Sequence, residues 1–461
     1  MRPTVRIAFD LSLAGGGNFF TLDDPIKGEL DGVGFTLAGE VAVDVSDDVR
    51  SVSVRRGRSR ELSAFSAGQA SVVLDNRTRL YDPTAGTATS PYGPSILPRK
   101  AIAIEVGGQA LFTGLVEDWD LQYSLGGDSI TTAKSTDGFT LLAGETLASG
   151  TATTELSGAR VVSVLDEVSW PDGRRDISAG VGTLGADVVA ENVTALSYLQ
   201  TIELSEAGAL FVSKVGALTF RDRIFSQNIP VLRFADDGSG VAFQDIELEY
   251  GTESLNTRLT VEYVGGTAVA DDAPAQVNYG VIDLNLKTVL ADAGEADDVA
   301  VFFLDRYASP TLRINGLAVN MDGLTAEQQQ QVITAELSDP VRIVFTPNGI
   351  PPAISQAVSI DRIEHDITPS SHIVRFNFSE TFTLNFDGII TGVSTSSGSV
   401  LGARGMFGEV IGVGVSSGSV LGARGMSGSA TGSTTSSGSV IGIKTIPFTL
   451  DTSELDEGRL A

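Results

Sequence analysis

The chain has 461 residues, with 31 Lys and Arg against 58 Asp and Glu, which gives a formal net charge of −27 at pH 7. Because like charges repel, this charge opposes nonspecific binding to DNA, RNA and anionic lipid headgroups, and we expect no stable nucleic-acid binding. The absence of cysteine excludes disulfides, thiolate metal sites and cysteine nucleophiles. The apolar content of 42% is ample for buried cores, and the length predicts about three domains.

The N-terminal segment, residues 1–18, lacks a charged region followed by a continuous apolar stretch. No window of the sequence reaches the roughly 18 uninterrupted apolar residues of a membrane helix. We therefore expect no membrane segment, and a protein that is made and used in the cytoplasm or leaves it by a route other than ordinary secretion. The triple Gly15-Gly16-Gly17 lacks the Lys-Ser/Thr of a phosphate-binding loop, so it predicts a turn or a flexible loop.

Residues 1–150 show the alternation of strands, with turn signals such as Gly107-Gly108 between them. This pattern predicts an N-terminal β-barrel or sandwich domain. The period changes to that of helices over 151–208, which predicts a helical insert. The alternating and helical positions are Val52, Val54, Ala70, Val72, Leu74, Ile102, Ile104 and Val106, then Val161, Val164, Leu165, Val168, Leu196, Leu199 and Ile202.

Strand character returns over 209–387, beginning with a hairpin that turns at Lys214-Val215-Gly216. Further strands are expected at 259–263, 358–360, 374–378 and 382–386, and two helices at 295–308 and 325–337. These elements predict a second β-barrel that contains helices. The fold class expected for the chain is mainly β with helical inserts, an α+β arrangement of two tandem barrels or sandwiches.

A Gly/Ser-rich region at 388–444 repeats a five-residue unit every ten residues, and a short acidic tail follows at 445–461. Collagen is excluded because the glycine spacings alternate between four and six. One unit holds too few apolar atoms to bury a core, so we expect the units to stack on one another or on identical chains. An ordered β array, as a trimeric prism or a solenoid, and a flexible tether remain open. The repeat glycines are Gly392, Gly398, Gly402, Gly408, Gly412, Gly418, Gly422, Gly428, Gly432, Gly438 and Gly442.

Several segments are spread over roughly residues 20–380: 55–60, 67–76, 81–83, 111–114 with 118–119, 195–199 with 205–208, 216–223, 278–280 and 363–367, with Asn256. Together they resemble minor tail proteins of long-tailed bacteriophages. The resemblance is closer to baseplate hub or tail-tip proteins of phages that infect actinobacteria. One departure is His372, at a position where such proteins are expected to have an aromatic residue.

The resemblance implies a trimeric hub whose two barrels per chain surround a central channel, so that three chains present a pseudo-sixfold ring to the tail tube. It implies a non-enzymatic structural protein at the virion tail tip, assembled in the host cytoplasm. The implied partners are the chain itself as a homotrimer, distal tail and other tail-tip proteins, and the tape-measure protein. Its implied role is to join a siphovirus-like tail tube to the distal tip and to frame the exit for DNA.

Candidate chemistry is sparse. The histidines, His365 and His372, lie seven residues apart across Pro369, and strand periodicity alone does not bring them together, so we expect structural roles for both. No Gly-x-Ser-x-Gly nucleophile elbow occurs. Adjacent acidic pairs predict solvated turns or opposite strand faces instead of a glycosidase pair. We therefore assign no catalytic, cofactor-binding or metal-binding residue and expect no cofactor. The acidic pairs are Asp23-Asp24, Asp47-Asp48, Asp271-Asp272 and Asp297-Asp298.

One concentrated basic run stands out in this acidic chain: Arg55, Arg56, Arg58 and Arg60. It predicts docking to an acidic surface of a neighbouring tail protein or subunit, or else a solvated edge strand whose charges discourage unwanted pairing. Two other function classes remain open. One is an extracellular β-rich protein that binds or degrades glycan, and the other is a receptor-binding adhesin.

Overall fold

The computed structural model describes residues 2–9, 41–58, 63–225, 230–252 and 254–380, together with the backbone of nine further strands. These residues fall into two units: Met1–Phe225 with Pro230–Glu380, and Ser226–Ile229 with Thr381–Ala461. None of the helices in the described part of the chain is long and apolar enough to cross a membrane.

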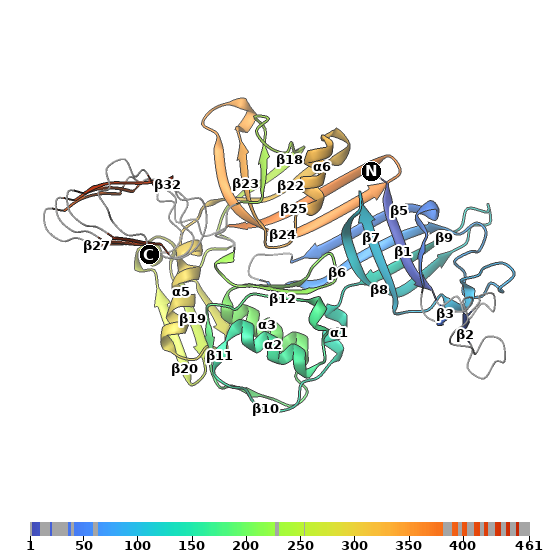
Figure 1. The fold of residues 1–461 in the computed structure, drawn as a ribbon, viewed down its shortest axis with the longest axis horizontal. Coiled ribbons are helices and arrows are strands. Elements are labelled where there is room, and N and C mark those ends of the chain that lie inside the picture. The colour runs from blue at the N-terminus through green and yellow to red at the C-terminus, as the bar shows by residue number, and fades with distance from the viewer. Residues whose placement is uncertain are drawn as a thin grey trace. The chain divides into compact units, whose positions relative to one another are not determined.

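The first unit is built on a sheet of thirteen strands (Figure 1). Its main path runs β18-β22-β25-β24-β5-β6-β9-β8-β7-β1-β4, and β17 and β23 join it through β24. The strands are β1 Pro3–Phe9, β4 Val41–Asp44, β5 Val49–Gly57, β6 Ser66–Asp75, β7 Lys100–Val106, β8 Gln109–Gln122, β9 Ile130–Thr136, β17 Leu232–Ala235, β18 Asp245–Tyr250, β22 Leu312–Asn320, β23 Pro340–Phe345, β24 Ile354–Thr368 and β25 Ser371–Glu380. The mainly β class expected from the sequence is confirmed.

The apolar residues that alternate with polar ones in the sequence are the buried residues of the strands. In β6, Ala70, Val72 and Leu74 are all buried, while the residues between them are partly exposed. The same holds for Ile102 and Ile104 in β7. Apolar side chains at every second position lie on one face of a strand, so this face is removed from water.

The pairing of β5 with β24 joins the N-terminal strands to strands more than 300 residues later in the chain. Gly57 makes this junction possible. Its φ is +114°, and a Cβ there would lie 2.1 Å from the carbonyl oxygen of Asp361. The sheet is therefore continuous between the segments 1–150 and 209–387, which the sequence predicts as separate domains. The division into tandem barrels, with its boundaries, stays a prediction.

The predicted helical stripes form helices α2 (Ser157–Glu167) and α3 (Ala195–Glu206), which pack on each other. The short helix α1 (Phe139–Gly144) contacts α3. Beside them lie small sheets: β10 Gly150–Thr151 with β14 Val188–Val189, β11 Glu155–Leu156 with β13 Thr183–Leu184, and β12 Arg175–Ile177 with β16 Leu218–Arg221 and β15 Ala209–Val212. The predicted hairpin at residue 214 is confirmed as the turn between β15 and β16.

A separate three-stranded sheet holds β19 (Arg258–Tyr263), β20 (Gly266–Asp271) and β21 (Asp283–Lys287). Helix α5 (Ala293–Tyr307) covers β19 and β20, and α4 (Ala273–Tyr279) connects β20 to β21. Helix α6 (Ala326–Thr334) begins with a capping box between Thr325 and Gln328. Helices α5 and α6 confirm the two predicted within the C-terminal half; α1 and α4 were not expected.

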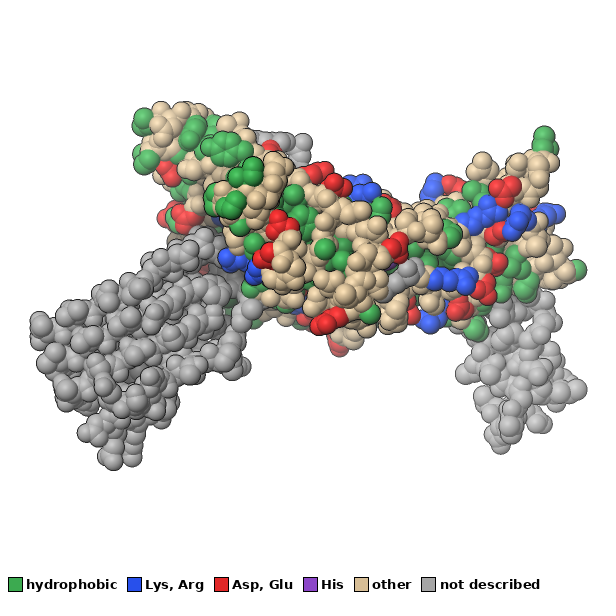
Figure 2. Space-filling view, turned by 90° about the horizontal axis from the view of Figure 1, so that it is seen from above, with side chains coloured by type: hydrophobic (Ala, Val, Ile, Leu, Met, Phe, Trp, Pro, Cys, Tyr) green, Lys and Arg blue, Asp and Glu red, His purple; other side chains and the backbone are tan. Residues whose placement is uncertain are grey.

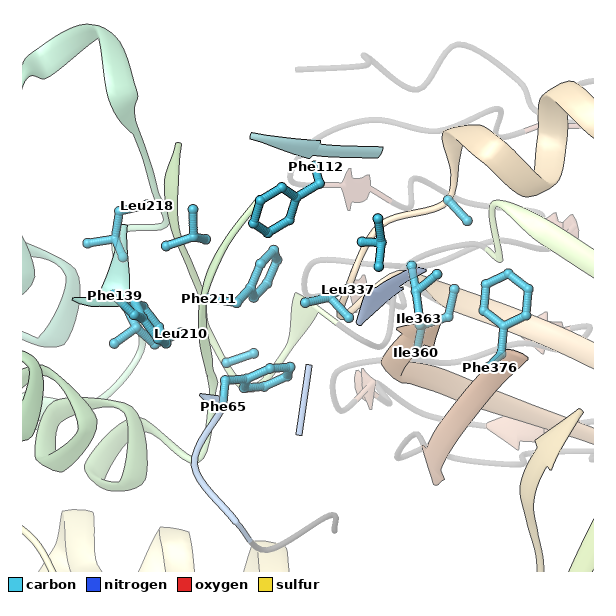
Figure 3. Packing of buried hydrophobic residues seen from close by; sticks show 14 of the residues in the cluster. Phe65, Phe112, Phe139, Leu210, Phe211, Leu218, Leu337, Ile360, Ile363 and Phe376 are labelled. Carbon is cyan, nitrogen blue, oxygen red and sulfur yellow. The ribbon is translucent and has the colours of Figure 1, made fainter. Parts of the chain in front are cut away.

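The cores of these parts are continuous. Figure 3 shows Phe211 of β15 between Phe112 of β8 and Phe65, with Leu337, Ile363 and Phe376 following on one side and Leu210, Leu218 and Phe139 on the other. Phe65, Phe112 and Phe211 are at most 2% exposed. Burying such aromatic side chains stabilises the fold by roughly 1.5–3 kcal/mol each. One apolar core therefore connects the main sheet to the helical segment.

In the second unit the described backbone forms two parallel sheets. One has the order β26-β28-β30-β32 and the other β27-β29-β31. Gly392 pairs with Gly412 and Gly432, and Gly402 with Gly422 and Gly442, so paired strands lie two decapeptides apart. The remaining repeat glycines and the strand expected at 382–386 lie outside the described residues. The strands are β26 Ile390–Ser394, β27 Ser399–Gly402, β28 Val410–Gly414, β29 Ser419–Gly422, β30 Ser429–Thr434, β31 Ser439–Gly442 and β32 Thr449–Leu450.

In the first unit, two further short strands near the N-terminus, β2 Phe19–Phe20 and β3 Thr36–Leu37, pair with each other.

Candidate functional site

The arginine run lies at the end of β5, where this strand meets β24. Arg55 remains 56% exposed, and its Nε lies 3.0 Å from Oε1 of Glu364. Arg56 is only 3% exposed, and its Nη1 donates to Oε1 of Glu336 at 2.6 Å. Alternate residues of a strand face opposite sides of the sheet, so two neighbouring arginines have opposite environments. Arg60 lies outside the described residues.

Glu336 connects three segments that are distant in the sequence. Its Oε1 accepts from Arg56, and its Oε2 accepts the backbone N–H of Lys214 at 3.0 Å. The Nζ of Lys214 donates to the carbonyls of Ile333, Thr334 and Ala335, at the end of α6. An ammonium group at this place satisfies helix carbonyls that have no partner within the helix.

Arg58 continues this set of charges on the other side of Gly57. Its Nη2 donates to Oδ1 of Asp361 at 2.9 Å, and its guanidinium lies 4.8 Å from the ring centroid of Phe65. The Oγ of Ser379 donates to the same carboxylate oxygen at 3.1 Å. We call Arg56, Arg58, Lys214, Glu336 and Asp361 the charged seam.

Glu203 of α3 lies near the seam and is 5% exposed. Burial raises the pKa of its carboxyl group to about 8, although Arg58 and the backbone N–H groups of Leu210 and Phe65 act in the opposite direction. Its Oε2 has no hydrogen-bond partner. Because desolvation penalises the charged form most, this carboxyl group carries a proton at neutral pH.

The two histidines, which the sequence did not bring together, are in contact. They flank the turn of the β24–β25 hairpin, where His372 pairs with Ile367 and His365 pairs with Val374. This register makes them diagonal neighbours on one face, and Nδ1 of His365 lies 3.1 Å from Nε2 of His372. Burial lowers the pKa of His372 to about 4, and burial together with His372, Arg56 and Lys214 lowers that of His365 well below its usual value.

The surroundings of the pair favour one tautomer. Both imidazoles are neutral, so one ring must donate and the other accept. Nδ1 of His372 is buried without a hydrogen-bond partner. At this buried position, a ring nitrogen that accepts no hydrogen bond costs less free energy than an N–H group that donates none. His372 therefore carries its proton on Nε2 and donates to Nδ1 of His365.

Members of two of the acidic pairs have structural partners. Asp48 accepts from the hydroxyl of Tyr81 at 2.7 Å, and Asp272 caps α4 by accepting from the N–H of Ala275 at 2.8 Å. Asp297 and Asp298 lie within α5. Asp23-Asp24 and Gly15-Gly16-Gly17 are outside the described residues. In the described part of the chain, no group of three or more His, Asp or Glu side chains is arranged to hold a metal ion.

The seam therefore ties segments together: β5, the β15–β16 turn, the end of α6 and β24 are held through buried or half-buried charges. Arg55, Arg56 and Arg58 all have internal partners, but Arg56 and Arg58 are largely removed from solvent, whereas Arg55 presents much of its side chain to it. Docking by the arginine run stays a prediction. Reversal of Arg56 or Arg58 would not test it cleanly, because breaking a buried ion pair also destabilises the fold.

No protein-family model matches this chain, and no curated protein matches its sequence. Two solved structures resemble its fold over most of their own length. The tail protein from Neisseria meningitidis MC58 has a TM-score of 0.51 at 11% identity, covering 82% of this chain and 96% of that protein. The 43 kDa tail protein of prophage MuSo2 from Shewanella oneidensis has a TM-score of 0.52 at 14% identity, covering 74% and 97%. The fold is that of phage-type tail proteins.

This tail-protein fold confirms the coarse part of the resemblance inferred from the sequence. The likeness to actinobacteriophage proteins in particular is not tested by it. Sequence inspection missed Glu203, Lys214 and Glu336. Lys214 lies in a correctly predicted turn, but the carbonyl groups that accept its hydrogen bonds belong to a helix more than 100 residues later in the chain. No local sequence pattern therefore indicates this contact.

Proposed function

We propose that the chain is a non-enzymatic structural protein of the virion, a trimeric tail-tip hub that joins the tail tube to distal tip proteins and frames the exit for DNA. The observation that carries this proposal is the shared fold with two tail proteins, which extends over nearly the whole of each of those proteins. The tape-measure protein and other tail-tip proteins are its proposed neighbours, with assembly in the host cytoplasm.

The ends of the main sheet support self-association. Among the described strands, β18 and β4 form the two ends of the sheet path. Tyr250 of β18 is 72% exposed, and Val41 of β4 is 45% exposed. A sheet edge with apolar side chains is a template for pairing with another chain. We propose that neighbouring copies cover these edges in the trimer.

The negative net charge of the chain is consistent with a channel through which DNA passes. With a net charge of −27, a lumen lined by this protein would repel the phosphate backbone and keep passing DNA from binding. On the face shown in Figure 2, acidic and basic side chains are interspersed. We propose that acidic residues line this passage.

Immunoelectron microscopy of assembled particles tests the location. Antibody against this chain should label the tail tip, and particles assembled without the chain should lack a complete tail. Complete tails with label only on peripheral fibres would favour the receptor-binding adhesin instead. Release of reducing sugar from host cell-wall polysaccharide by the purified chain would favour the glycan-degrading alternative.

The docking role is tested at Arg55, because it is the described arginine of the run that is more than half exposed. Arg55→Glu should lower incorporation of the chain into tails while its thermal unfolding temperature stays near that of the wild type. Arg174→Glu, at an exposed arginine outside the run, is the matched control. Normal incorporation of the Arg55 variant would contradict docking through this residue.

A further inference from the structure

A cavity of about 320 Å³ lies between α3, the segment around Ala64, β21 and α5. Its apolar walls include Leu204, Leu284, Leu286 and Phe303. The volume is near the lower end of the range of ligand pockets, about 300–1,000 Å³. An apolar cavity of about 150 Å³ is large enough to hold benzene, so this one has room for a molecule of two fused rings.

The two guanidinium groups of the lining have partners within the protein. Nη2 of Arg58 lies 2.9 Å from Oδ1 of Asp361. The guanidinium carbon of Arg306 lies 5.2 Å from the ring centroid of Phe302 and 5.9 Å from that of Tyr307. Neither group is therefore a reason to expect an anionic ligand.

Three polar side chains of α3 that line the cavity donate to backbone carbonyls. The Oγ of Ser197 donates to Thr194 at 2.9 Å, and the Oγ1 of Thr201 donates to Ser197 at 3.1 Å. The Nε2 of Gln200 donates to Phe65 at 3.2 Å. Because these side chains are held by the backbone, Glu203 is the side chain of this helix that is left to donate to a ligand.

Glu203 has a carboxyl oxygen without a partner. The residue is 5% exposed and lines the cavity, and its Oε2 has no hydrogen-bond partner. The backbone N–H groups of Leu210 and Phe65 act on the same carboxyl group, so they reach its other oxygen, Oε1. Burial raises the pKa of this group to about 8 and keeps it protonated at neutral pH. Since Oε1 accepts from N–H groups, the proton lies on Oε2 and is available to an acceptor.

We propose that this cavity binds a small neutral molecule that has an apolar ring system and one carbonyl oxygen. The Oε2–H group of Glu203 donates to this oxygen, and Phe303 and the three leucines contact the rings. A donor in an apolar cavity favours a ligand with an acceptor, because a buried O–H group without a partner is costly. An amine would instead have to take the proton of Glu203 and enter beside two guanidinium groups. This binding does not depend on the proposed role in the tail.

Calorimetric titration of the purified full chain with 1-indanone and with indane tests the proposal. The two probes share a fused-ring skeleton, and only 1-indanone has a carbonyl oxygen. Both should bind at pH 6. The ratio of the affinity for 1-indanone to that for indane should fall about fivefold or more between pH 6 and pH 9.5, because the ionised carboxylate of Glu203 cannot donate. Effects of pH that are common to both probes cancel in this ratio.

Variants of Glu203 separate its titration from that of its neighbours. Arg58 and Asp361 also act on the charge of this carboxyl group, and Arg306 and Tyr307 share the lining of the cavity. Glu203→Gln keeps a donor, so the ratio of affinities should stay constant over the same pH range. Glu203→Leu has no donor and should weaken the binding of 1-indanone by about fivefold or more, while the binding of indane is unchanged.

Ala64→Trp tests the location of the site. Ala64 lines the cavity and is exposed, so an indole at this position should occupy the space and prevent the binding of both probes. Ala88→Trp, at an exposed alanine outside the lining, is the matched control and should bind both probes as the wild type does.

A ratio of affinities that stays constant with pH in the wild type would overturn the proposal. The absence of binding by both probes up to their solubility limits would also overturn it, as would unchanged binding by the Ala64 variant. Because the pH comparison uses the wild-type chain, it decides the question even if a variant fails to fold. A chain that binds 1-indanone in this way but does not enter tails would leave this site standing and contradict the hub instead.

Discussion

Nδ1 of His365 lies 3.1 Å from Nε2 of His372, across the two strands of the β24–β25 hairpin. Both rings are buried, and β5 lies on the other side of β24, where His365 pairs with Val54. The chain's histidines thus form one neutral pair at the place where β24 joins the N-terminal strand β5. This arrangement couples protonation to the integrity of the junction.

Acid should weaken the fold through this pair. The pKa of His372 falls from 6.5 in the unfolded chain to about 4 in the folded chain, so the folded state binds fewer protons between these values and its stability falls as the pH falls through them. The contribution is at most on the order of 3 kcal/mol, at about 1.4 kcal/mol per pKa unit. Urea denaturation of wild type and His372→Phe between pH 7 and pH 4 measures it.

The phenylalanine variant should lose less stability over this range, because only His365 remains to be protonated. Other titrating groups are common to both proteins and cancel in the difference between them. Parallel curves of unfolding free energy against pH for the two proteins would contradict a protonation penalty at His372.

Two adjacent arginines should differ sharply in their contributions to stability. Arg56→Ala leaves Glu336 without its buried partner and should cost roughly 3–5 kcal/mol. Arg55→Ala removes an exposed pair with Glu364 and should cost about 0–1 kcal/mol. Urea unfolding of the two variants gives both values, and similar costs for the two would show that the seam does not hold the segments together.

Alkaline pH should destabilise the fold through Glu203. Its pKa rises from 4.5 in the unfolded chain to about 8 in the folded chain, so the folded state binds more protons in this window. The stabilising effect is complete below pH 4.5 and is lost as the pH rises through about 8, by roughly 1.4 kcal/mol per unit of pKa difference.

Glu203→Gln cannot lose this proton, so the difference in unfolding free energy between variant and wild type should grow from pH 5 to pH 9. Glu191→Gln, at an exposed position, is the control and should follow the wild type throughout. If the Glu203 variant follows it as well, the carboxyl group is already ionised in the folded protein.

A methyl group at Gly57 should disrupt the contact between β5 and β24. Gly57→Ala places Cβ 2.1 Å from the carbonyl oxygen of Asp361 and requires a φ of +114°, which L side chains rarely adopt. The expected loss is at least roughly 2 kcal/mol. Thermal unfolding should show it, whereas Gly86→Ala, where a Cβ meets no atom within 4 Å, should unfold close to the wild-type temperature.

Local patterns predicted the elements well. The apolar residues from Val161 to Leu165 lie in α2, and the alternating apolar residues from Ala70 to Leu74 lie in β6. Both were predictable because the buried face of a helix or strand requires apolar residues at the spacing of that element. The pairing of β5 with β24 joins residues that no local pattern connects, so sequence inspection left these strands in separate domains.

The contact between His365 and His372 could have been predicted from the sequence. Thr368 pairs with Ser371 across a two-residue turn at Pro369 and Ser370, and this register alone places His365 diagonally opposite His372. What was missing was the recognition of a tight hairpin at Pro369. The burial of Arg56 had a weaker signal, because its partner Glu336 follows a helix whose position only the fold determines.

The mass of the purified full chain in solution, measured by native mass spectrometry, tests the hub most directly. We predict a stable species of three times 48.0 kDa, in which neighbouring copies cover the edges of β18 and β4. A species of 48.0 kDa that persists at the highest attainable protein concentration, with no trimer in assembled tips either, would contradict it.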